Sequence, residues 1–391
     1  MVNIYLKSGR DKPVRMRHPW IFSGSISKVE GAGRPGDLCR VFSSKGEFLA
    51  TGYFNPESAI NVRVLSNKNS LFDRSALQFR MLRAIRARNP LLTGGTDSCR
   101  LINSEGDFLP GLIVDKYSSG LVVQILTAGM ENFRSDITEI LLSQEAPPEF
   151  IFERSDTDAR RREGLEARSG TLSGKVPPRF LLQENGIRFR VEVESGQKTG
   201  FFFDQRPNRN LLREYAQDRV MCDCFCYSGA FSVNALYAGV RSVDLVDISK
   251  PALGWAEENI AENGFSDRDV KFISSDIFKY LRQTDKNYDL IVLDPPKFAR
   301  HPGELQAASR GYKDINLIAM KKIRPDGIIF TFSCSNAVDP KLFRQIVFSA
   351  AADAGRQVQV LHVLTSGPDH PVNIAHKEGE YLKGLVLKIL E

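Results

Sequence analysis

The sequence predicts an α/β protein: a Rossmann-like, doubly wound, mostly parallel sheet in the C-terminal half, preceded by a small β-barrel and a middle α+β segment. Three observations predict this class. From about residue 191, continuous apolar strands alternate with helices, which is typical of parallel sheets covered on both faces. The first 70 residues contain short strands between Gly and Pro clusters. With 391 residues, the chain is also long enough for two or three domains.

Residues 1–70 read as short strands, among them VNIYL, HPWIFSGSISKVE and INVRVLS. This segment is also the basic part of the chain. It holds 11 Lys and Arg against 5 Asp and Glu, whereas the rest of the chain holds 42 of each kind. A compact basic domain attracts a polyanion such as RNA, because Lys and Arg contacts to phosphate release counterions. The candidate phosphate ligands are Lys7, Arg10, Lys12, Arg15 and Arg17.

Residues 71–190 read as mixed α and β. A helix is predicted at about 72–87, followed by the strand pair FLPGLIVDKY and GLVVQIL. The charged segment 153–175 is expected to be an exposed loop. Further on, FLLQENGIRFRVEV places Asn185-Gly186 between two alternating runs, which is the strongest short-range hairpin signal. The predicted domains are therefore 1–70, 71–190 and 191–391.

In the C-terminal domain, strands are predicted at 220–225 and 242–249, and a helix from Pro251 to about Asn263, with Ser249 as its cap and Gly264 as its stop. Three later strands are predicted at KFISSD, YDLIVLD and GIIFTFS, and a last helix near Asp339-Pro340. In such sheets, ligands bind outside the carboxyl ends of the strands. The residues that follow each strand are therefore the candidates for the site.

The turn after the first strand, FCYSGAF at 225–231, lacks the G-x-G-x-x-G pattern that cradles a pyrophosphate, which disfavours NAD. Asp247 stands 18 residues beyond Gly229, a distance typical of ribose recognition. Asp276 follows the third strand and is a candidate partner for an adenine amino group. A nucleoside without phosphates, such as S-adenosylmethionine, fits both facts. The alternative is that each aspartate only caps a helix.

The fourth strand ends in Asp294-Pro295-Pro296-Lys297-Phe298. Two prolines cannot continue a central strand, so they fix an extended loop and aim the Asp294 side chain, which predicts a substrate wall rather than only a rigid turn. The fifth strand ends in Cys334, between Ser333 and Ser335. Unpaired cysteine most often behaves as a small buried hydrophobe, and this is the alternative to a reactive thiol.

Six segments carry a family resemblance: QKTGFFFDQR at 197–206, DCFCYSGAFSV, LDPPKF, RGYKDIN, TFSCS, and DHP with EGEYLKG. With them, the chain resembles bacterial 23S rRNA cytosine-5 methyltransferases that have a PUA domain, a middle EEHEE domain and a class I methyltransferase domain. The resemblance implies S-adenosylmethionine as methyl donor. The implied cofactor contacts are Asp204, Gln205, Arg206, Phe225, Tyr227, Ser228, Gly229, Asp247, Asp276 and Asp294.

The resemblance also implies a role for Cys334. Its thiolate would add to C6 of a flipped or single-stranded cytosine and make C5 nucleophilic, while Asp294 would hydrogen-bond the N3/N4 edge of the base. The loop residues Pro295, Pro296, Lys297 and Phe298 would contact the substrate. Related enzymes with two cysteines carry the second one where this chain has Lys297. The base that removes the C5 proton is therefore left unassigned.

Two other functions stay open: an rRNA guanine N-methyltransferase in which Cys334 is structural, and a non-catalytic RNA-binding assembly factor. The six cysteines and the lack of a long apolar segment predict a cytoplasmic protein with reduced thiols and no membrane partner. Cys222, Cys224 and Cys226 favour core packing over zinc, and no metal is expected. The expected partner is 23S rRNA, naked or in a pre-50S particle, and the oligomeric state is open, with a homodimer among the alternatives.

Overall fold

The computed structural model describes residues 1–193, 199–299 and 302–390. The chain divides into two compact units. Within the described ranges, no helix combines the length and the apolarity that a membrane crossing requires. The predicted domain boundaries, at 70/71 and 190/191, remain our proposal. The N-terminal unit comprises Met1–Leu182, Val191–Phe203 and Pro368–Gly379, and the C-terminal unit comprises Gln183–Arg190, Asp204–Gly367 and Glu380–Glu391.

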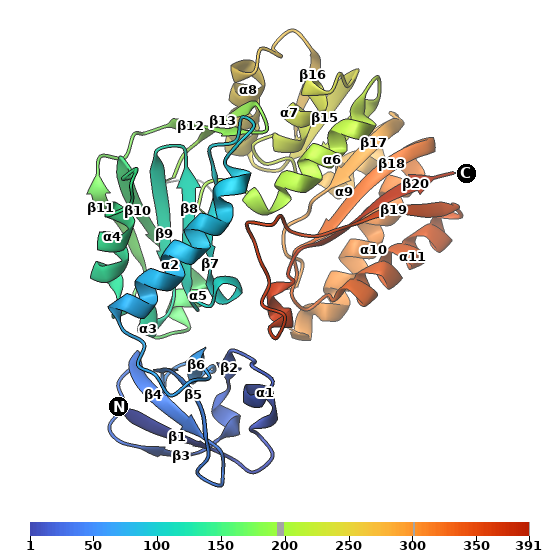
Figure 1. Cartoon of the computed structure of the whole chain (residues 1–391). Coiled ribbons are helices and arrows are strands. Elements are labelled where there is room, and N and C mark those ends of the chain that lie inside the picture. Colours follow the sequence, from blue (N-terminus) through green and yellow to red (C-terminus); the bar gives the residue numbers. More distant parts are fainter. Residues whose placement is uncertain (194–198, 300–301, 391) are drawn as a thin grey trace. The chain divides into compact units, whose positions relative to one another are not determined.

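The first sheet of the N-terminal unit has six strands in the order β2-β6-β5-β4-β1-β3 (Figure 1). Alternating apolar residues place Ile4, Val41 and Val62 in one fully buried core. The stretch from His18 to Glu30, predicted as one strand, is split by a 3₁₀ turn at Ser23–Ser25, since Ser and Gly favour turns. The elements are β1 (Val2–Leu6), α1 (Lys12–Arg15), β2 (Trp20–Ile21), β3 (Ile26–Glu30), β4 (Asp37–Phe42), β5 (Phe48–Phe54) and β6 (Val62–Ser66).

The second sheet of this unit has five strands in the order β11-β10-β9-β8-β7. The helix predicted near 72–87 is confirmed as α2 (Arg74–Arg88). It begins after Asp73, whose Oδ1 accepts a hydrogen bond from the backbone N–H of Ala76 at 2.9 Å. The predicted strand pair is confirmed as β8 and β9. The other elements are β7 (Cys99–Asn103), β8 (Leu112–Tyr117), β9 (Gly120–Ile125), α3 (Ala128–Glu131), α4 (Arg134–Leu142) and β10 (Phe150–Ser155).

The prediction of an exposed loop at 153–175 was wrong. The segment contains α5 (Asp158–Arg161) and β11 (Arg168–Gly174), and β11 pairs antiparallel with β10. The reason lies in long-range pairing of its charges. Arg160 is buried, and its Nη1 donates to the carbonyl oxygen of Ile125 and to Glu131 Oε2, each at 2.7 Å. A charge that is paired in this way does not need solvent.

The predicted Asn-Gly hairpin is confirmed. It joins β12 (Phe180–Glu184) to β13 (Ile187–Val191). Asn185 and Gly186 have φ angles of 49° and 82°, and both central residues of a type I′ turn need positive φ. Asparagine and glycine tolerate this conformation best, which is why the dipeptide signals the turn so reliably.

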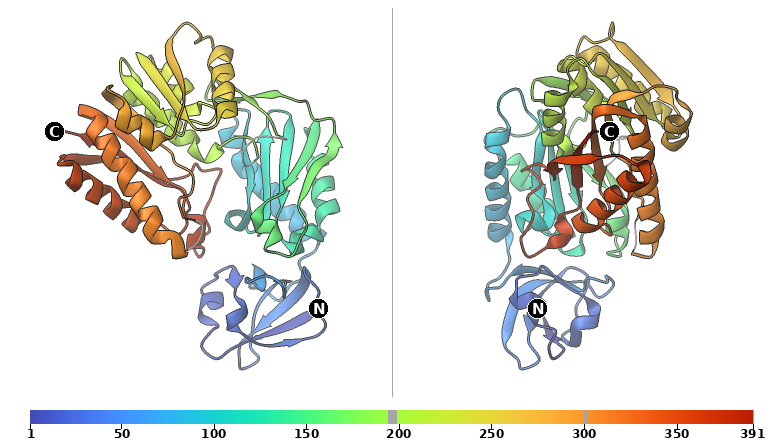
Figure 2. Two further views of the ribbon diagram at one scale, coloured as in Figure 1. Left: turned by 180° about the vertical axis from the view of Figure 1, so that it is seen from behind. Right: turned by 90° about the vertical axis from the view of Figure 1, so that its right-hand side faces the viewer.

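The C-terminal unit contains a seven-stranded sheet in the order β16-β15-β14-β17-β18-β20-β19, with helices on both faces (Figures 1 and 2). Each pair from β16 to β18 is parallel, and β20 runs antiparallel between β18 and β19. This confirms the doubly wound, mostly parallel sheet. Its strands are β14 (Val220–Cys224), β15 (Ser242–Asp247), β16 (Asp269–Ser274), β17 (Tyr288–Leu293), β18 (Ile323–Ser333), β19 (Val358–Leu364) and β20 (Lys383–Ile389).

The helices of this unit begin and end where local signals place them. Ser249 Oγ accepts from the backbone N–H of Ala252 at 3.3 Å, Gly264 follows with φ 76°, and Asp339 Oδ1 caps the last helix by accepting from Leu342 N at 2.7 Å. Ser249 and Gly264 were predicted as the cap and the stop of α8, and the last helix was predicted to begin near Asp339-Pro340. The helices are α6 (Arg206–Ala216), α7 (Ala230–Tyr237), α8 (Lys250–Glu262), α9 (Ile277–Gln283), α10 (Leu305–Lys322) and α11 (Pro340–Ala354).

Candidate active site

The candidate site lies at the carboxyl ends of four neighbouring strands, β15, β14, β17 and β18. Parallel strands end at the same edge of a sheet, so the residues that follow them meet there. Asp247 ends β15, the turn from Phe225 follows β14, Asp294 follows β17, and Cys334 follows β18. Sequence positions more than a hundred residues apart are thus brought to one edge.

The turn between β14 and α7 has an unusual backbone. Phe225, Tyr227 and Gly229 have φ angles of 62°, 49° and 72°, and two of these three are non-glycine residues. Such conformations cost free energy and are retained where the surroundings over-determine them. The backbone N–H of Phe225 donates to the carbonyl oxygen of Val246 at 2.9 Å. At Gly229, an added Cβ would lie 2.9 Å from the Cβ of Ala256, so the position also needs glycine for space.

Asp247 fastens this turn through its carboxylate. Its Oδ2 accepts from the backbone N–H of Tyr227 at 3.0 Å, and its Oδ1 accepts from Ser249 N at 2.8 Å. A carboxylate has about four acceptor sites, so capacity remains for a ligand hydroxyl. Ile248 beside it is 72% exposed, an apolar surface next to the carboxylate.

Asp276 lies beside Asp247, because the backbone N–H of Ser275 donates to the carbonyl oxygen of Asp247 at 3.1 Å. The Asp276 side chain is exposed and caps α9, with Oδ1 accepting from Lys279 N at 2.9 Å. Helix capping therefore occupies one of its two carboxylate oxygens.

The DQR residues are buried; Asp204 and Gln205 lie in the 3₁₀ turn Phe203–Gln205, and Arg206 begins α6. Gln205 Nε2 donates to Asp294 Oδ2 at 3.0 Å, and Tyr381 Oη donates to Asp204 Oδ2 at 2.6 Å. Arg206, at the start of α6, is 6% exposed. Gln205 thus ties the DQR block to the loop after β17. Of the block 197–206, residues 197 and 198 lie outside the described residues.

Asp223 is a candidate that the sequence analysis missed. It lies inside β14 and is 1% exposed, with Oδ2 accepting from the backbone N–H and the Oγ of Ser232 at 3.2 and 2.6 Å. Burial raises the pKa of Asp223 from its ordinary value of 3.8 to about 7, and the negative charges of Asp294 and Asp247 add to the rise. A charged residue within an apolar strand was the signal that could have identified it.

The raised pKa of Asp223 predicts a pH-dependent stability. Between pH 4 and pH 7 the unfolded chain releases this proton and the folded chain keeps it, so folding stability falls as pH rises and levels off above about pH 7. We expect the difference in the free energy of unfolding, Asp223→Asn minus wild type, to increase by about 1.4 kcal/mol for each pH unit from pH 5 to pH 7. Urea titrations at four pH values measure it.

Asp269→Asn, which removes an exposed carboxylate from the same sheet, is the control and should track wild type at every pH. A constant difference between Asp223→Asn and wild type from pH 5 to pH 8 would show that the carboxyl group is not perturbed.

Cys334 lies on a turn that its serine neighbours fix. Ser335 is fully buried; its Oγ donates to the carbonyl oxygen of Ala299 at 3.2 Å and lies 3.2 Å from Tyr312 Oη. Cys334 itself is half-buried, and its Sγ lies 3.8 Å from the carbonyl oxygen of Pro295. The thiol therefore faces the loop after β17, with its backbone held by contacts that do not involve the sulfur.

The loop after β17 alternates in exposure. Pro295 is buried, whereas Pro296 and Lys297 are exposed. Phe298 is half-buried, and its ring centroid lies 4.7 Å from that of Tyr312. The predicted substrate contacts thus divide into two exposed residues and two that help to anchor the loop.

The other cysteines differ from Cys334 in burial. Cys222 and Cys224 have no exposed surface and belong to the core of the C-terminal sheet, and Cys39, Cys99 and Cys226 are also buried. Burial raises the pKa of Cys39 to about 12 and holds the pKa values of Cys224 and Cys226 well above the usual thiol range. These three side chains remain protonated at neutral pH, so they are poor nucleophiles.

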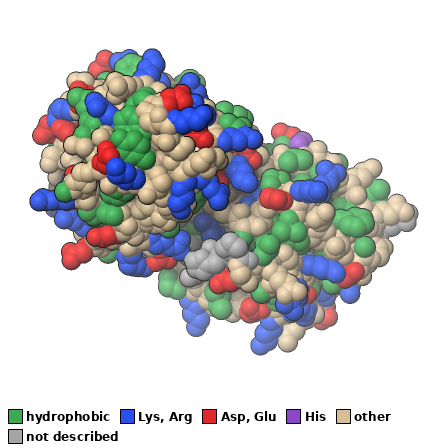
Figure 3. Space-filling model, turned by 90° about the horizontal axis from the view of Figure 1, so that it is seen from below, with side chains coloured by type: hydrophobic (Ala, Val, Ile, Leu, Met, Phe, Trp, Pro, Cys, Tyr) green, Lys and Arg blue, Asp and Glu red, His purple; other side chains and the backbone are tan. Residues whose placement is uncertain are grey.

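The predicted phosphate ligands are exposed in the segment between β1 and β2, with Lys12 and Arg15 on α1. Lys7 Nζ donates to the carbonyl oxygen of Gly24 at 2.9 Å, and Arg15 pairs with both Asp11 and Glu47. A phosphate at Arg15 would compete with these two carboxylates, whereas the side chains of Arg10 and Arg17 are simply exposed. In the view from below, Lys and Arg side chains form several separate groups with acidic side chains between them (Figure 3).

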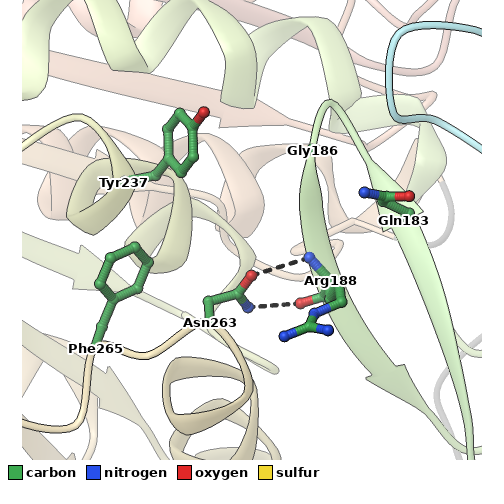
Figure 4. A pocket seen from close by; sticks show the side chains of 6 residues that line it. All are labelled: Gln183, Gly186, Arg188, Tyr237, Asn263 and Phe265. Atoms are coloured by element: carbon green, nitrogen blue, oxygen red, sulfur yellow. Dashed lines mark hydrogen bonds between the residues drawn. The ribbon is translucent and has the colours of Figure 1, made fainter.

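A separate pocket of about 610 Å³ opens at the β12–β13 hairpin (Figure 4). Its walls include Arg188 and Asn263, which are hydrogen-bonded to each other. The backbone N–H of Arg188 donates to Asn263 Oδ1 at 3.0 Å, and Asn263 Nδ2 donates to the carbonyl oxygen of Arg188 at 2.7 Å. The C-terminal ends of α7 and α8 lie beside it. Each of these helices begins at the carboxyl end of a strand and runs back along the sheet, so its own C-terminal end lies near the amino ends of the strands. The pocket is therefore at the opposite edge of the sheet from Cys334. The lining residues are Gln183, Gly186, Arg188, Tyr237, Asn263 and Phe265.

The residues at the strand ends fit S-adenosylmethionine. Its ribose diol and its ammonium and sulfonium groups need acceptors or negative charge. Asp247 and Asp294 lie close enough to Asp223 for their negative charges to raise its pKa. The exposed Ile248 offers an apolar surface for an adenine ring. A phosphate-free ligand agrees with a turn that has one glycine.

Comparison with known proteins agrees with this geometry. A model of the PUA-like domain matches residues 4–67, and a model of the S-adenosylmethionine-dependent methyltransferase family matches residues 159–379. The protein named ribosomal RNA large subunit methyltransferase I of Pseudoalteromonas translucida is 41% identical over 392 residues, which cover 99% of each chain. The protein of the same name from Shewanella denitrificans is 42% identical over 396 residues, with the same coverage.

Solved structures show the same fold. A putative S-adenosylmethionine-dependent methyltransferase from Streptococcus mutans superposes with a TM-score of 0.85 at 22% identity, covering 99% of this chain and 100% of that chain. A putative methyltransferase complexed with SAH gives a TM-score of 0.87 with the same identity and coverage. The predicted fold class and cofactor are thus confirmed. The chain belongs to the S-adenosylmethionine-dependent methyltransferase family, in a group with an N-terminal PUA-like domain.

Proposed function

We propose that this methyltransferase forms 5-methylcytosine in large-subunit (23S) ribosomal RNA through a covalent bond between Cys334 and C6 of the target cytosine. The ribosomal substrate is supported by the names of relatives that match over nearly the whole chain and by the basic PUA-like domain. The action would take place in the cytoplasm, where ribosomal RNA and reduced thiols occur together.

The observation that carries the choice of chemistry is the placement of Cys334. Cys334 is half-buried, whereas the other five cysteines are buried. It follows β18, the strand next to β17, which Asp294 follows. Cys226 also lies at the ligand-binding edge of the sheet, but it is buried and protonated, so Cys334 is the cysteine that a substrate can reach there. A methyltransferase that acts on guanine nitrogen needs no thiol there.

The thiol answers a chemical requirement of the cytosine ring. C5 is too poor a nucleophile to accept a methyl group directly, so the Cys334 thiolate forms a bond to C6 and its electrons raise the density at C5. S-adenosylmethionine would supply the electrophilic methyl group: C5 would bond to this carbon as the methyl–sulfonium bond breaks, and S-adenosylhomocysteine would be left. When a base then removes the C5 proton, the C5–C6 double bond is restored, the C6–S bond breaks, and the thiolate leaves with its electron pair.

Other residues would orient the reactants. Asp294, held by Gln205, would hydrogen-bond the N3/N4 edge of the cytosine. A protonated Asp294 carboxyl group would be the donor that stabilises the negative charge developing at N3. Pro296 and Lys297, exposed after β17, would line the cytosine side. On the cofactor side, the proposed contacts are Asp204, Gln205, Arg206, Phe225, Tyr227, Ser228, Gly229, Asp247, Asp276 and Asp294.

The test uses methyl-labelled S-adenosylmethionine with unmodified 23S rRNA, offered both as a transcript and within large subunits that lack the modification. We expect labelled 5-methylcytidine among the product nucleosides. A transcript that carries 5-fluorocytidine should in addition stay attached to the protein under denaturing conditions, because C5 then has no proton to lose and the C6–S bond persists.

A labelled methylguanosine would contradict the proposed base. Labelled 5-methylcytidine without any trapped complex would instead contradict the covalent route and return Cys334 to a structural role. The ratio of rates on the two substrates shows whether naked RNA or the particle is preferred.

A further inference from the structure

Lys383 is a buried lysine that the proposed mechanism has not used. It begins β20, which lies beside β18 (Figure 1), and in the antiparallel register it stands opposite Ser333. Only 5% of the residue is exposed. Its Nζ donates to the carbonyl oxygen of Ser335 at 2.6 Å. The ammonium group is therefore fixed against the turn that carries Cys334, with Ser333 on one side of the cysteine and Ser335 on the other.

The charged groups that face this ammonium come from three elements. They are Cys334 on the turn after β18, Asp339 at the start of α11, and Lys297 on the loop after β17. Burial lowers the pKa of Lys383 to about 8; a negative charge on Cys334 opposes this shift, Lys297 adds to it, and Asp339 opposes it more weakly. Asp339 is exposed and already caps α11. A buried ammonium group is costly without an anion beside it. Cys334 stands between Ser333, which Lys383 faces across the sheet, and Ser335, which it bonds, so the Cys334 thiolate can supply that anion.

We propose that Lys383 is a positioning residue whose ammonium group holds Cys334 as the thiolate. The nucleophile in the covalent step is the thiolate and not the thiol, and a neighbouring lysine is one of the devices that stabilise it. This inference rests on the proposed function only for the reaction of the thiolate, which is its addition to C6 of cytosine. It also separates Cys334 from Cys224 and Cys226, which lack such a partner in the described contacts and stay protonated.

The experiment measures the reactivity of Cys334 toward iodoacetamide from pH 6 to pH 10, in the full chain without RNA or cofactor. Mass spectrometry of the peptide that contains Cys334 gives the alkylation rate at each pH. For Lys383→Met we expect the midpoint of the rate profile to rise by at least about one pH unit, so that the rate at pH 7 falls about tenfold. At pH 10 the rates of the two proteins should converge, because both thiols are then ionised.

Two further variants make the result specific. Lys383→Arg keeps the positive charge and should stay within about threefold of wild type at pH 7. Lys388→Met removes a lysine from the same strand, where it pairs with Asp326 at 2.9 Å, and should leave the profile unchanged. The buried Cys222 and Cys224 report on folding, since an unfolded variant would expose both to the reagent and speed up their alkylation.

The outcomes distinguish this inference from the proposed function. A rise in the midpoint for Lys383→Met, with Cys222 and Cys224 still protected, supports the role of Lys383 whatever nucleoside the enzyme forms. An unchanged midpoint in the folded variant overturns that role even if 5-methylcytidine is the product. If Lys383→Met unfolds, Lys383→Arg decides: a profile that matches wild type supports the charge, and a shift of more than about one unit overturns it.

Discussion

Replacing Cys334 with alanine is expected to lower the rate of methyl transfer at least about 1,000-fold, or about 4 kcal/mol in activation free energy. Without the thiolate no bond can form at C6, and C5 stays a poor nucleophile. The structural cost should be small, because the turn is held by Ser335 and Lys383 and not by the sulfur. Without the thiolate beside it, Lys383 can release its proton, since burial lowers its pKa to about 8. Single-turnover rates at saturating cofactor measure the effect, and calorimetric titration with S-adenosylmethionine should give an affinity within about twofold of wild type.

Cys99→Ala is the matched control. This variant makes the same cysteine-to-alanine change at a fully buried position in the N-terminal unit, and should keep the rate within about threefold of wild type. Cys334→Ser tests the element itself, since a hydroxyl of nearly the same shape is a far weaker nucleophile and should be as inactive as alanine. A Cys334→Ala enzyme that retains more than about a tenth of the wild-type rate would show that the reaction does not pass through this thiol.

The features that the sequence predicted well are those whose cause is local. Ser249 and Asp339 cap helices by bonding a backbone N–H three residues away, and Asn185-Gly186 turns a hairpin because both residues tolerate positive φ. The strand-end rule is a rule of topology, so it brings Asp247 and Cys334 to one edge once the strands are recognised. No distant contact has to be known for any of these predictions.

What the sequence did not predict depends on distant partners. Lys383 belongs to β20, which runs antiparallel to both its neighbours in the seven-stranded sheet, and nothing near it in the chain says that β20 inserts beside β18. Asp223 was overlooked because its role follows from burial and from carboxylates on other strands. In the same way, Arg160 gave segment 153–175 the appearance of a solvated loop, although its partners lie on other elements. Charge pairing of this kind leaves no periodic signal in the sequence.

The second large effect is expected at Glu184, in the C-terminal unit. Its carboxylate accepts two hydrogen bonds from Arg209, from Nε and Nη2, each at 2.7 Å, and the two side chains are only 1% and 2% exposed. Glu184→Ala removes the carboxylate that accepts from both Nε and Nη2 of the buried guanidinium group, so we expect a loss of about 3–5 kcal/mol in the free energy of unfolding. Urea titration in a Trp20→Phe background measures it, since the fluorescence then comes from Trp255 in α8.

The double variant Glu184→Leu with Arg209→Met tests the cause. Removing both charges avoids the uncompensated guanidinium group, so its stability should return to within about 2 kcal/mol of wild type. Asp314→Ala breaks an exposed pair with Arg282 in the same unit and should cost less than about 1 kcal/mol. If the double variant is as unstable as Glu184→Ala, the loss comes from packing between β12 and α6. If the double variant recovers its stability, apolar side chains can replace the Glu184–Arg209 pair without loss of stability. The pair then serves to position α6, whose N-cap residue Gln205 bonds Asp294.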